Sequence, residues 1–92
     1  MQKFTVTIDE IIQETSDVTT FKLRFNSGES IGFFPGQFVM VALESDPKNA
    51  KAYSLASSSC IKDHVEITVK IYPDGRFSPL LNKAKVGDKL VI

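Results

Sequence analysis

The chain has 92 residues, of which 42% are hydrophobic and 24% are charged. This length allows one domain, which buries about 60–65% of the surface that its unfolded chain exposes, and the composition excludes a disordered protein. Lys plus Arg and Asp plus Glu both number 11, so a formal net charge of zero offers no overall field to attract nucleic acid or an anionic membrane.

Three stretches in the first half of the chain predict strands. Apolar residues alternate with polar ones over residues 4–8, and less cleanly to residue 12, and again over residues 18–25. Residues 37–43 are apolar on both faces, which indicates a strand buried on both sides or one whose second face meets another domain. We assign Phe38, within this third stretch, to the core.

The second half of the chain predicts a polar loop over residues 44–49, a strand over residues 65–72 and a short helix after residue 77. Ser78 can cap the free N–H groups of this helix, because serine is favoured at that position and Pro79 suits the first helical turn. We expect about two helical turns, ended by residues 86–88, with Leu80, Leu81 and Ala84 on one face. Residues 89–92 begin a further strand.

Five or six strands with one late, short helix indicate an all-β, antiparallel barrel rather than a fold that alternates strands and helices. No internal repeat, linker or low-complexity tract divides the chain. We therefore expect residues 1–92 to form one barrel domain whose last strand is incomplete at Ile92.

Cysteine and histidine are each present once. Cys60 cannot form an internal disulfide, and alone it cannot hold zinc or an iron–sulfur cluster, so no metal site is expected and a reducing cytoplasm is the simplest location. His64 has no visible partner and is expected to be solvated. The chain shows neither the apolar run of a signal peptide nor the roughly 20 apolar residues of a membrane helix, which predicts a soluble protein without a membrane partner.

A stretch from Lys51 to Ser59 combines a cation, an aromatic ring and a run of hydroxyl groups. Alternate side chains of such a stretch could face one planar, phosphorylated ligand, although an ordinary strand followed by a serine-rich loop has the same composition. Two further motifs accompany it: Phe-Pro-Gly-Gln-Phe at residues 34–38, and Gly-Arg-Phe-Ser at residues 75–78, which is followed by Gly-Asp at residues 87–88.

In this order the motifs PGQF, (R)xYSxxS, GxxS and GD run from Phe34 to Asp88, and the chain resembles the flavin-binding domain of ferredoxin-NADP reductase-type oxidoreductases. The resemblance implies a six-stranded antiparallel Greek-key β-barrel with one short capping helix. The chain departs from the family pattern at Lys51, where the family usually has arginine. Lysine keeps the charge but loses the planar fork that grips a phosphate at two points.

The resemblance also implies roles for the residues of the central motif. Tyr53 could stack on the flavin ring or form a hydrogen bond with its ribityl chain. Ser54 matches the serine that the family places near the flavin N5 atom, and it is the candidate catalytic residue. Lys51 lies two residues before Tyr53, hence on the same strand face, and can reach a phosphate.

The segment before the helix is the predicted phosphate site, because its counterpart in the family binds the flavin pyrophosphate. Gly75 lets the backbone approach, Arg76 adds charge and Ser78 offers a hydroxyl group near the free N–H groups of the helix. The strand end at residues 68–70 lines the flavin in the family, although from its residue type alone Val69 equally suits the core. The full set of expected cofactor-binding residues is Lys51, Ala52, Tyr53, Ser54, Thr68, Val69, Lys70, Gly75, Arg76, Phe77 and Ser78.

These features predict the FAD-binding domain of an NAD(P)H-dependent flavin oxidoreductase that transfers reducing equivalents between a nicotinamide and an electron carrier or substrate, with FMN as the alternative flavin. The chain lacks a G-x-G-x-x-G motif after a strand, so NAD(P)H requires a nicotinamide-binding domain or partner subunit. One alternative is a flavin-holding electron-transfer subunit without NAD(P)H activity of its own. Another is a small barrel that binds single-stranded nucleic acid, which the zero net charge disfavours.

Overall fold

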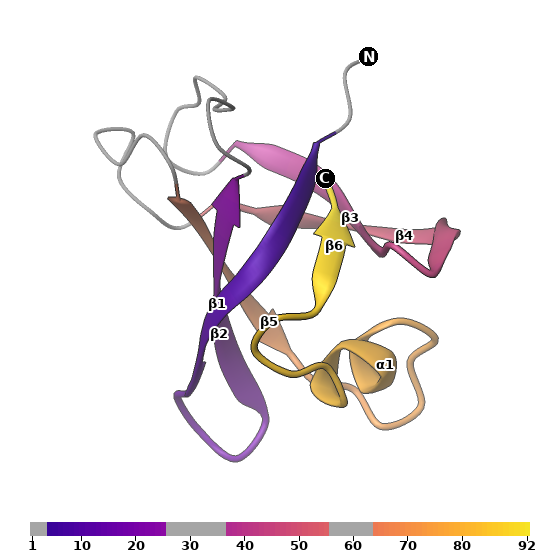
Figure 1. Cartoon of the computed structure of the whole chain (residues 1–92). Coiled ribbons are helices and arrows are strands. Elements are labelled where there is room, and N and C mark those ends of the chain that lie inside the picture. The colour runs from indigo at the N-terminus through magenta and orange to yellow at the C-terminus, as the bar shows by residue number, and fades with distance from the viewer. Residues whose placement is uncertain (1–3, 26–36, 56–63) are drawn as a thin grey trace.

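The computed structural model describes residues 4–25, 37–55 and 64–92. In chain order its elements are β1 (Thr5–Gln13), β2 (Val18–Phe25), β3 (Phe38–Leu43), β4 (Asp46–Ser54), β5 (His64–Lys70), α1 (Ser78–Asn82) and β6 (Lys89–Val91) (Figure 1). Pro35 and Gly36 of the PGQF motif, and the serine run with Cys60 at residues 57–60, lie outside the described residues.

The strands form one six-stranded antiparallel sheet in the order β4-β3-β6-β1-β2-β5. A bridge between Leu55 and Ile67 brings the end of β4 to β5, and β6 returns to lie beside β3, which gives the Greek-key order of β3 to β6. The all-β class is therefore confirmed. The sheet is not a closed barrel, because among the described residues the two edge strands share this bridge and no continuous ladder.

The core lies on the inner face of the curved sheet. β5 shows the pattern most clearly, since its inward residues Val65, Ile67 and Val69 are fully buried while the residues between them are more exposed. α1 lies beside the loop that leads into β6 (Figure 1) and adds its buried Leu81 to the core. The core cluster comprises Val6, Ile8, Phe21, Leu23, Phe25, Val41, Leu55, Val65, Ile67, Val69, Phe77, Leu81, Leu90 and Ile92.

The third strand is not buried on both faces. Val41 faces the core, whereas Phe38 is 71% exposed and Met40 51% exposed on the opposite face. The assignment of Phe38 to the core is therefore wrong. The error has a physical cause: when both faces of a strand are apolar, the sequence does not indicate which face turns toward the core.

The predicted loop over residues 44–49 is instead a tight turn followed by a strand. Leu43 pairs directly with Asp46, so Glu44 and Ser45 alone form the turn, and β4 begins at Asp46. Asp46, Pro47 and Lys48 are exposed along the start of this strand, and Asn49 is half-buried. An exposed edge strand tolerates Pro47 and charged residues, which blunt its tendency to pair with other chains.

The helix is shorter than predicted and is capped differently. It comprises five residues, its N-cap is Phe77, and no side chain caps it. Leu81 is buried but Leu80 is 39% exposed. The hydroxyl group of Ser78 bonds to the backbone of Tyr72 instead of to the helix.

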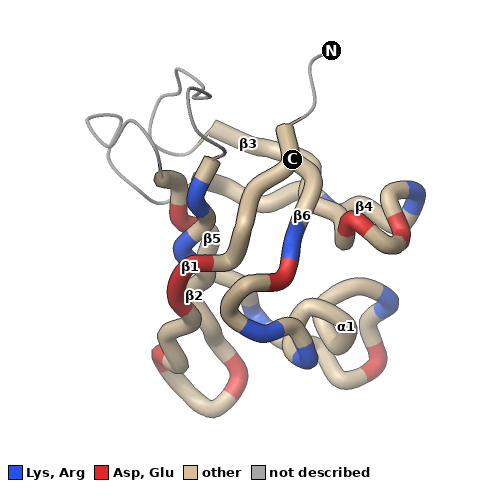
Figure 2. The backbone as a smooth tube through the Cα atoms, in the orientation of Figure 1, with Lys and Arg blue, Asp and Glu red and all other residues tan. Residues whose placement is uncertain are grey.

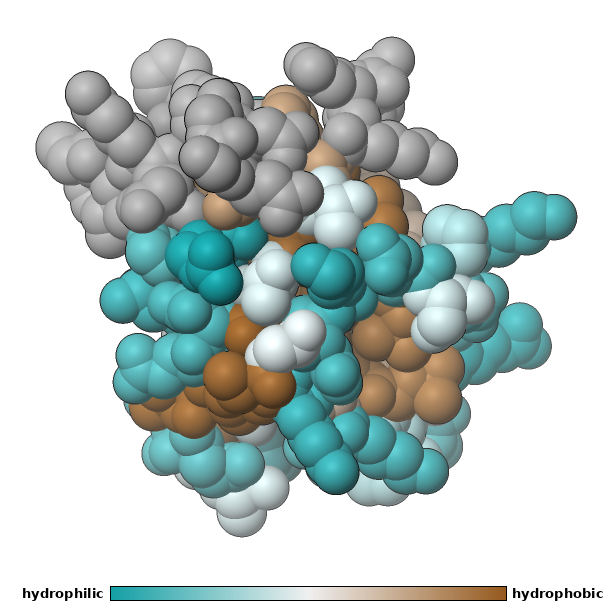
Figure 3. Space-filling model, viewed as in Figure 1, coloured by the Kyte–Doolittle hydropathy of each residue, from teal (hydrophilic) through white to brown (hydrophobic). Residues whose placement is uncertain are grey.

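Charged residues of both signs occur on the β1–β2 hairpin, on the β3–β4 hairpin and around α1 (Figure 2). Apolar residues appear on the same side of the molecule as separate patches between hydrophilic ones (Figure 3). Within the described residues, no helix is long and apolar enough to cross a membrane.

An ionic cluster joins the outer faces of β1, β2 and β5. The carboxylate of Asp9 lies 3.1 Å from Nε2 of His64 and 3.4 Å from Nε of Arg24. The hydrogen bond with His64, and next that with Arg24, lower the pKa of Asp9. His64 is thus paired, and its side chain is only 18% exposed, so the expectation of a solvated histidine is wrong.

The exposure of Phe38 predicts how its replacement affects stability. Phe38→Thr should change the free energy of unfolding by no more than about 0.5 kcal/mol, because the side chain buries little surface. The matched core variant Ile67→Ala should cost about 2–5 kcal/mol. Urea denaturation of both variants measures this difference, and a large loss for Phe38→Thr would show that the side chain is buried in solution.

The Asp9 cluster predicts a contribution to stability that depends on pH. Because the folded-state pKa of Asp9 is lowered, its contribution is present above the unfolded-state value and is lost as the pH falls through the folded-state value. Asp9→Asn should therefore lower the urea midpoint at neutral pH, and the difference from the unmodified chain should vanish in strong acid. A difference that stays constant with pH would contradict an ionic role.

Candidate functional site

Three alternate residues of β4 contact the segment that follows β5. Nδ2 of Asn49 donates a hydrogen bond to the carbonyl oxygen of Arg76 at 3.5 Å, and Nζ of Lys51 lies 5.6 Å from the ring centroid of Tyr72. The ring of Tyr53 packs against that of Phe77, with 6.0 Å between centroids and an interplanar angle of 41°. Side chains at every second position of a strand point to the same face, so these three lie on one face of β4 and residues 72–77 lie across it.

The hydroxyl group of Tyr53 is buried without a hydrogen-bond partner among the described residues. Burial raises the pKa of this phenol, because the charged form would lose its hydration. A buried, unsatisfied hydroxyl costs about 1–3 kcal/mol, and native proteins seldom keep one without a reason. A ligand that offers one acceptor or donor at this point would remove that cost.

The segment from Tyr72 to Ser78 is held by one side chain. Oγ of Ser78 accepts a hydrogen bond from the backbone N–H of Tyr72 at 2.9 Å and lies 3.3 Å from the carbonyl oxygen of Tyr72, to which it can donate. The N–H of Gly75 closes a turn on that same oxygen at 2.9 Å. A Cβ atom at Gly75 would lie 3.2 Å from both oxygens, a tight contact that a side chain could make only if these neighbours shifted.

Two lysine ammonium groups lie near the ring of Tyr72, a residue that the sequence motifs did not predict as part of the site. Nζ of Lys70 lies 5.5 Å from its ring centroid and Nζ of Lys51 lies 5.6 Å from it. Both lysines are exposed, and the tyrosine is 46% exposed. The available signal was the spacing, since Tyr72 follows Lys70 by two residues, but only the fold shows that Lys51 reaches the same ring.

Four further residues that were predicted for the site lie in β4 and β5. Val69 is fully buried in the core, and the hydroxyl group of Thr68 pairs with that of Thr20 on β2 at 3.0 Å. Ala52 and Ser54 are exposed on the face of β4 opposite Tyr53, where they pair with Met40 and Phe38 on β3.

The edge position of β4 allows one ligand to meet both of its faces. β4 is the terminal strand of the sheet and forms its ladder with β3 on one side. A flat ligand along the other side can contact the inward-facing Tyr53 and also the outward-facing Ser54. The arrangement thus offers an aromatic surface, an unsatisfied hydroxyl and two cations within a short length of chain.

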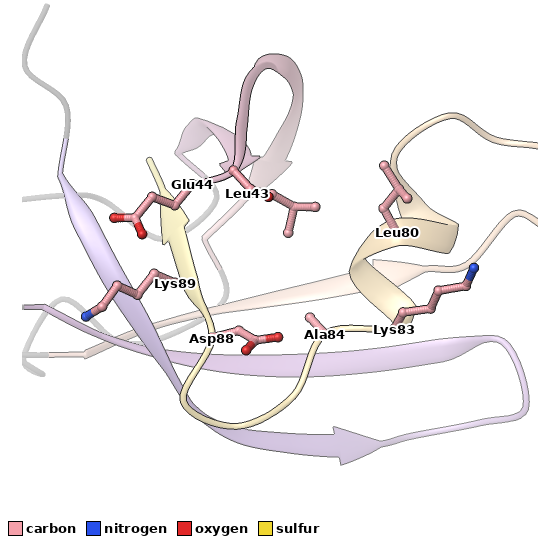
Figure 4. Close-up of a pocket in the computed structure, with 8 residues that line it drawn as sticks. Leu43, Glu44, Leu80, Lys83, Ala84, Asp88 and Lys89 are labelled. Atoms are coloured by element: carbon pink, nitrogen blue, oxygen red, sulfur yellow. The ribbon is translucent and has the colours of Figure 1, made fainter.

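A hollow of about 330 Å³ lies apart from these residues. It is lined by the β3–β4 turn, α1 and the start of β6, and Leu43 and Leu80 approach it from the hairpin and the helix (Figure 4). None of the predicted cofactor-binding residues lines it. In the described part of the chain, no group of three or more His, Cys, Asp or Glu side chains is placed to hold a metal ion.

Comparison with known proteins agrees with these motifs. The family model of the oxidoreductase FAD-binding domain matches residues 5–92. The glycine betaine monooxygenase reductase subunit of Chromohalobacter salexigens is 40% identical over 85 residues, which are 90% of this chain and 23% of that protein. The ferredoxin–NADP reductase of Pseudomonas aeruginosa is 35% identical over 75 residues, which are 80% of this chain and 29% of that protein.

A solved structure described as a ferredoxin reductase in carbazole 1,9a-dioxygenase superposes with a TM-score of 0.88 at 34% identity. The match covers 98% of this chain and 27% of that one. The chain thus spans about a quarter of the length of the relatives it matches.

The unsatisfied hydroxyl of Tyr53 predicts opposite effects of one substitution on stability and on binding. Tyr53→Phe should stabilise the ligand-free chain by about 1 kcal/mol, because it removes a buried polar group without a partner. It should weaken flavin binding severalfold, because the same group is the expected partner of the ligand. Urea denaturation without flavin and fluorescence titration with FAD measure the two effects.

The matched control is Tyr72→Phe, which removes a phenol hydroxyl from an exposed ring and should leave the stability of the ligand-free chain nearly unchanged. A loss of stability in Tyr53→Phe would show that its hydroxyl is already bonded in solution.

Proposed function

The chain belongs to the oxidoreductase FAD-binding domain family, and we propose that it holds the FAD of a reductase that passes electrons from NAD(P)H to a ferredoxin or an oxygenase component. The observation that carries this proposal is the buried hydroxyl of Tyr53, without a partner among the described residues, beside Phe77 and two residues from Lys51. A polar atom left unpaired next to an aromatic surface and a cation fits a ligand that is itself planar, polar at its edge and phosphorylated.

The residues present fit FAD in three ways. The hydroxyl of Tyr53 would bond to the ribityl chain or the ring edge, and its ring offers an apolar surface. Lys51 and Lys70 would compensate the phosphate charges, together with Arg76 of the neighbouring turn. Ser54, at the end of the edge strand, would place its hydroxyl at the ring edge from the other face of β4.

FAD, when bound, supplies the redox chemistry by accepting two electrons from a nicotinamide and releasing them to an acceptor. The contribution of this chain is to bind and orient the flavin. Ser54 is exposed, so its proposed role near the reacting edge is that of a hydrogen-bonding group. Ser78 is buried with its hydroxyl on Tyr72, and we propose that it orders the phosphate-binding segment.

The remaining parts of the reaction are proposals drawn from the relatives. Because the matched relatives are about three to four times as long as this chain, we propose that NAD(P)H binds to a further domain or a partner subunit. The names of the relatives support two kinds of acceptor. One matched protein is a ferredoxin–NADP reductase, and others are reductase components of monooxygenases and dioxygenases.

The test of the proposal is a titration of the chain with FAD and with FMN, followed by quenching of flavin fluorescence. We expect saturable binding that Lys51→Met weakens, and that weakens further at high salt because the lysine is exposed. Lys51→Arg should strengthen binding severalfold, since the guanidinium can grip a phosphate at two points. Lys83→Met, which removes an exposed charge beside the hollow, is the matched control and should bind FAD as the unmodified chain does.

Lack of saturable binding by the unmodified chain would overturn the proposal. An unchanged affinity in Lys51→Arg would instead leave the function in place and contradict the importance of the fork geometry.

A further inference from the structure

Two lysines from different parts of the fold share one aromatic ring. Lys51 lies in β4 and Lys70 ends β5, and their ammonium nitrogens lie 5.6 Å and 5.5 Å from the ring centroid of Tyr72. The sum of these two distances sets the largest possible separation of the two nitrogens, about 11 Å. We propose that Tyr72 is a positioning residue that gathers Lys51 and Lys70 into a two-cation clamp for the flavin phosphate groups, an inference that rests on the proposed function.

The backbone of Tyr72 is held by two residues of the GxxS motif. Ser78 bonds to the N–H of Tyr72 and contacts its carbonyl oxygen, and Gly75 closes a turn on the same oxygen. Ser78 is only 2% exposed, so this anchor is protected from water. The ring of Tyr72 thus projects from a backbone that is fixed on both of its polar groups, although the ring itself is 46% exposed.

The ring of Tyr72 stabilises both ammonium groups. Each cation near the face of an aromatic ring gains about 0.5–1 kcal/mol at an exposed site. Neither lysine forms an ion pair with a described residue, since the ion pairs in that part of the chain join Asp9 to Arg24 and His64. Two cations at one ring, neither of them paired with an acidic residue of the described chain, suit a ligand with more than one negative charge, as a phosphate or diphosphate has.

The clamp also accounts for lysine at the position where the resemblance leads one to expect arginine. One guanidinium can contact a phosphate at two points, whereas one ammonium is a single point charge. Here a second ammonium, from β5, lies at the same ring as the first. Two point charges at one ring can thus supply two contacts with phosphate, although without the fixed parallel geometry of a guanidinium.

The test compares the affinities of the full chain for FAD, FMN and riboflavin, which lacks phosphate. Tyr72→Leu keeps an apolar side chain but removes the aromatic face, so it should weaken FAD and FMN binding about fivefold or more and leave riboflavin binding within about twofold. The dependence of FAD affinity on salt should decrease in parallel. Tyr72→Phe keeps the aromatic face and should restore both the affinity and its salt dependence.

Lys70→Met should cause the same phosphate-selective loss, and combining it with Tyr72→Leu should add little to either change alone. Circular dichroism shows whether Tyr72→Leu folds. If it does not fold, the affinities of Lys70→Met test the proposal in its place. The control Lys83→Met should not affect any of the three affinities.

Three results would overturn the clamp while leaving the proposed function intact. Equal losses for the three flavins would place Tyr72 against the flavin ring, a loss for FAD alone would place it against the adenosine part, and no loss would remove it from the site. Failure of the unmodified chain to bind any of the three would overturn the proposed function and the clamp together.

Discussion

The hydroxyl group of Ser78 holds the backbone of Tyr72, and the arrangement of the site depends on this contact. A short helix of five residues cannot by itself fix the long connection from β5 to β6. With Tyr72 anchored, the segment lies across β4, so that Phe77 meets Tyr53 and the carbonyl of Arg76 meets Asn49. Gly75 belongs to the same constraint, because any larger residue would press on the two oxygens involved.

Sequence patterns correctly predicted the strands that have apolar residues on one face only. β2 and β5 have apolar residues at every second position, and the residues that the pattern turned inward are buried. Phe38 was misplaced because both faces of its strand are apolar, and burial there depends on which strands cover it. β4 was taken for a loop at its start because Asp46 and Pro47 are typical of turns, whereas an exposed edge strand accepts them.

The candidate site was predictable as a set of motifs but not as a set of contacts. Lys51, Tyr53 and the GxxS segment are close in the fold as the resemblance implied, whereas Val69 is in the core and Thr68 faces Thr20. Ser78 was expected to cap the helix or to bind phosphate. It does not cap the helix but bonds to the backbone of Tyr72, six residues earlier in the chain, and no local propensity identifies such a hydrogen bond. Its contact with phosphate stays a prediction. Tyr72 was not predicted, because its role depends on a lysine of β4 and a lysine of β5 that lie near the same ring.

The unsatisfied hydroxyl group of Tyr53 destabilises the isolated chain. A buried phenol without a partner among the described residues reduces the stability of the ligand-free state. A marginally stable domain of this size retains few such features without a compensating gain. Because the hydroxyl group of Tyr53 and the ammonium group of Lys51 lie on the face of β4 covered by residues 72–77, one anionic, planar ligand can contact both at once. The hydroxyl group that weakens the free chain therefore increases the stabilisation that flavin binding supplies.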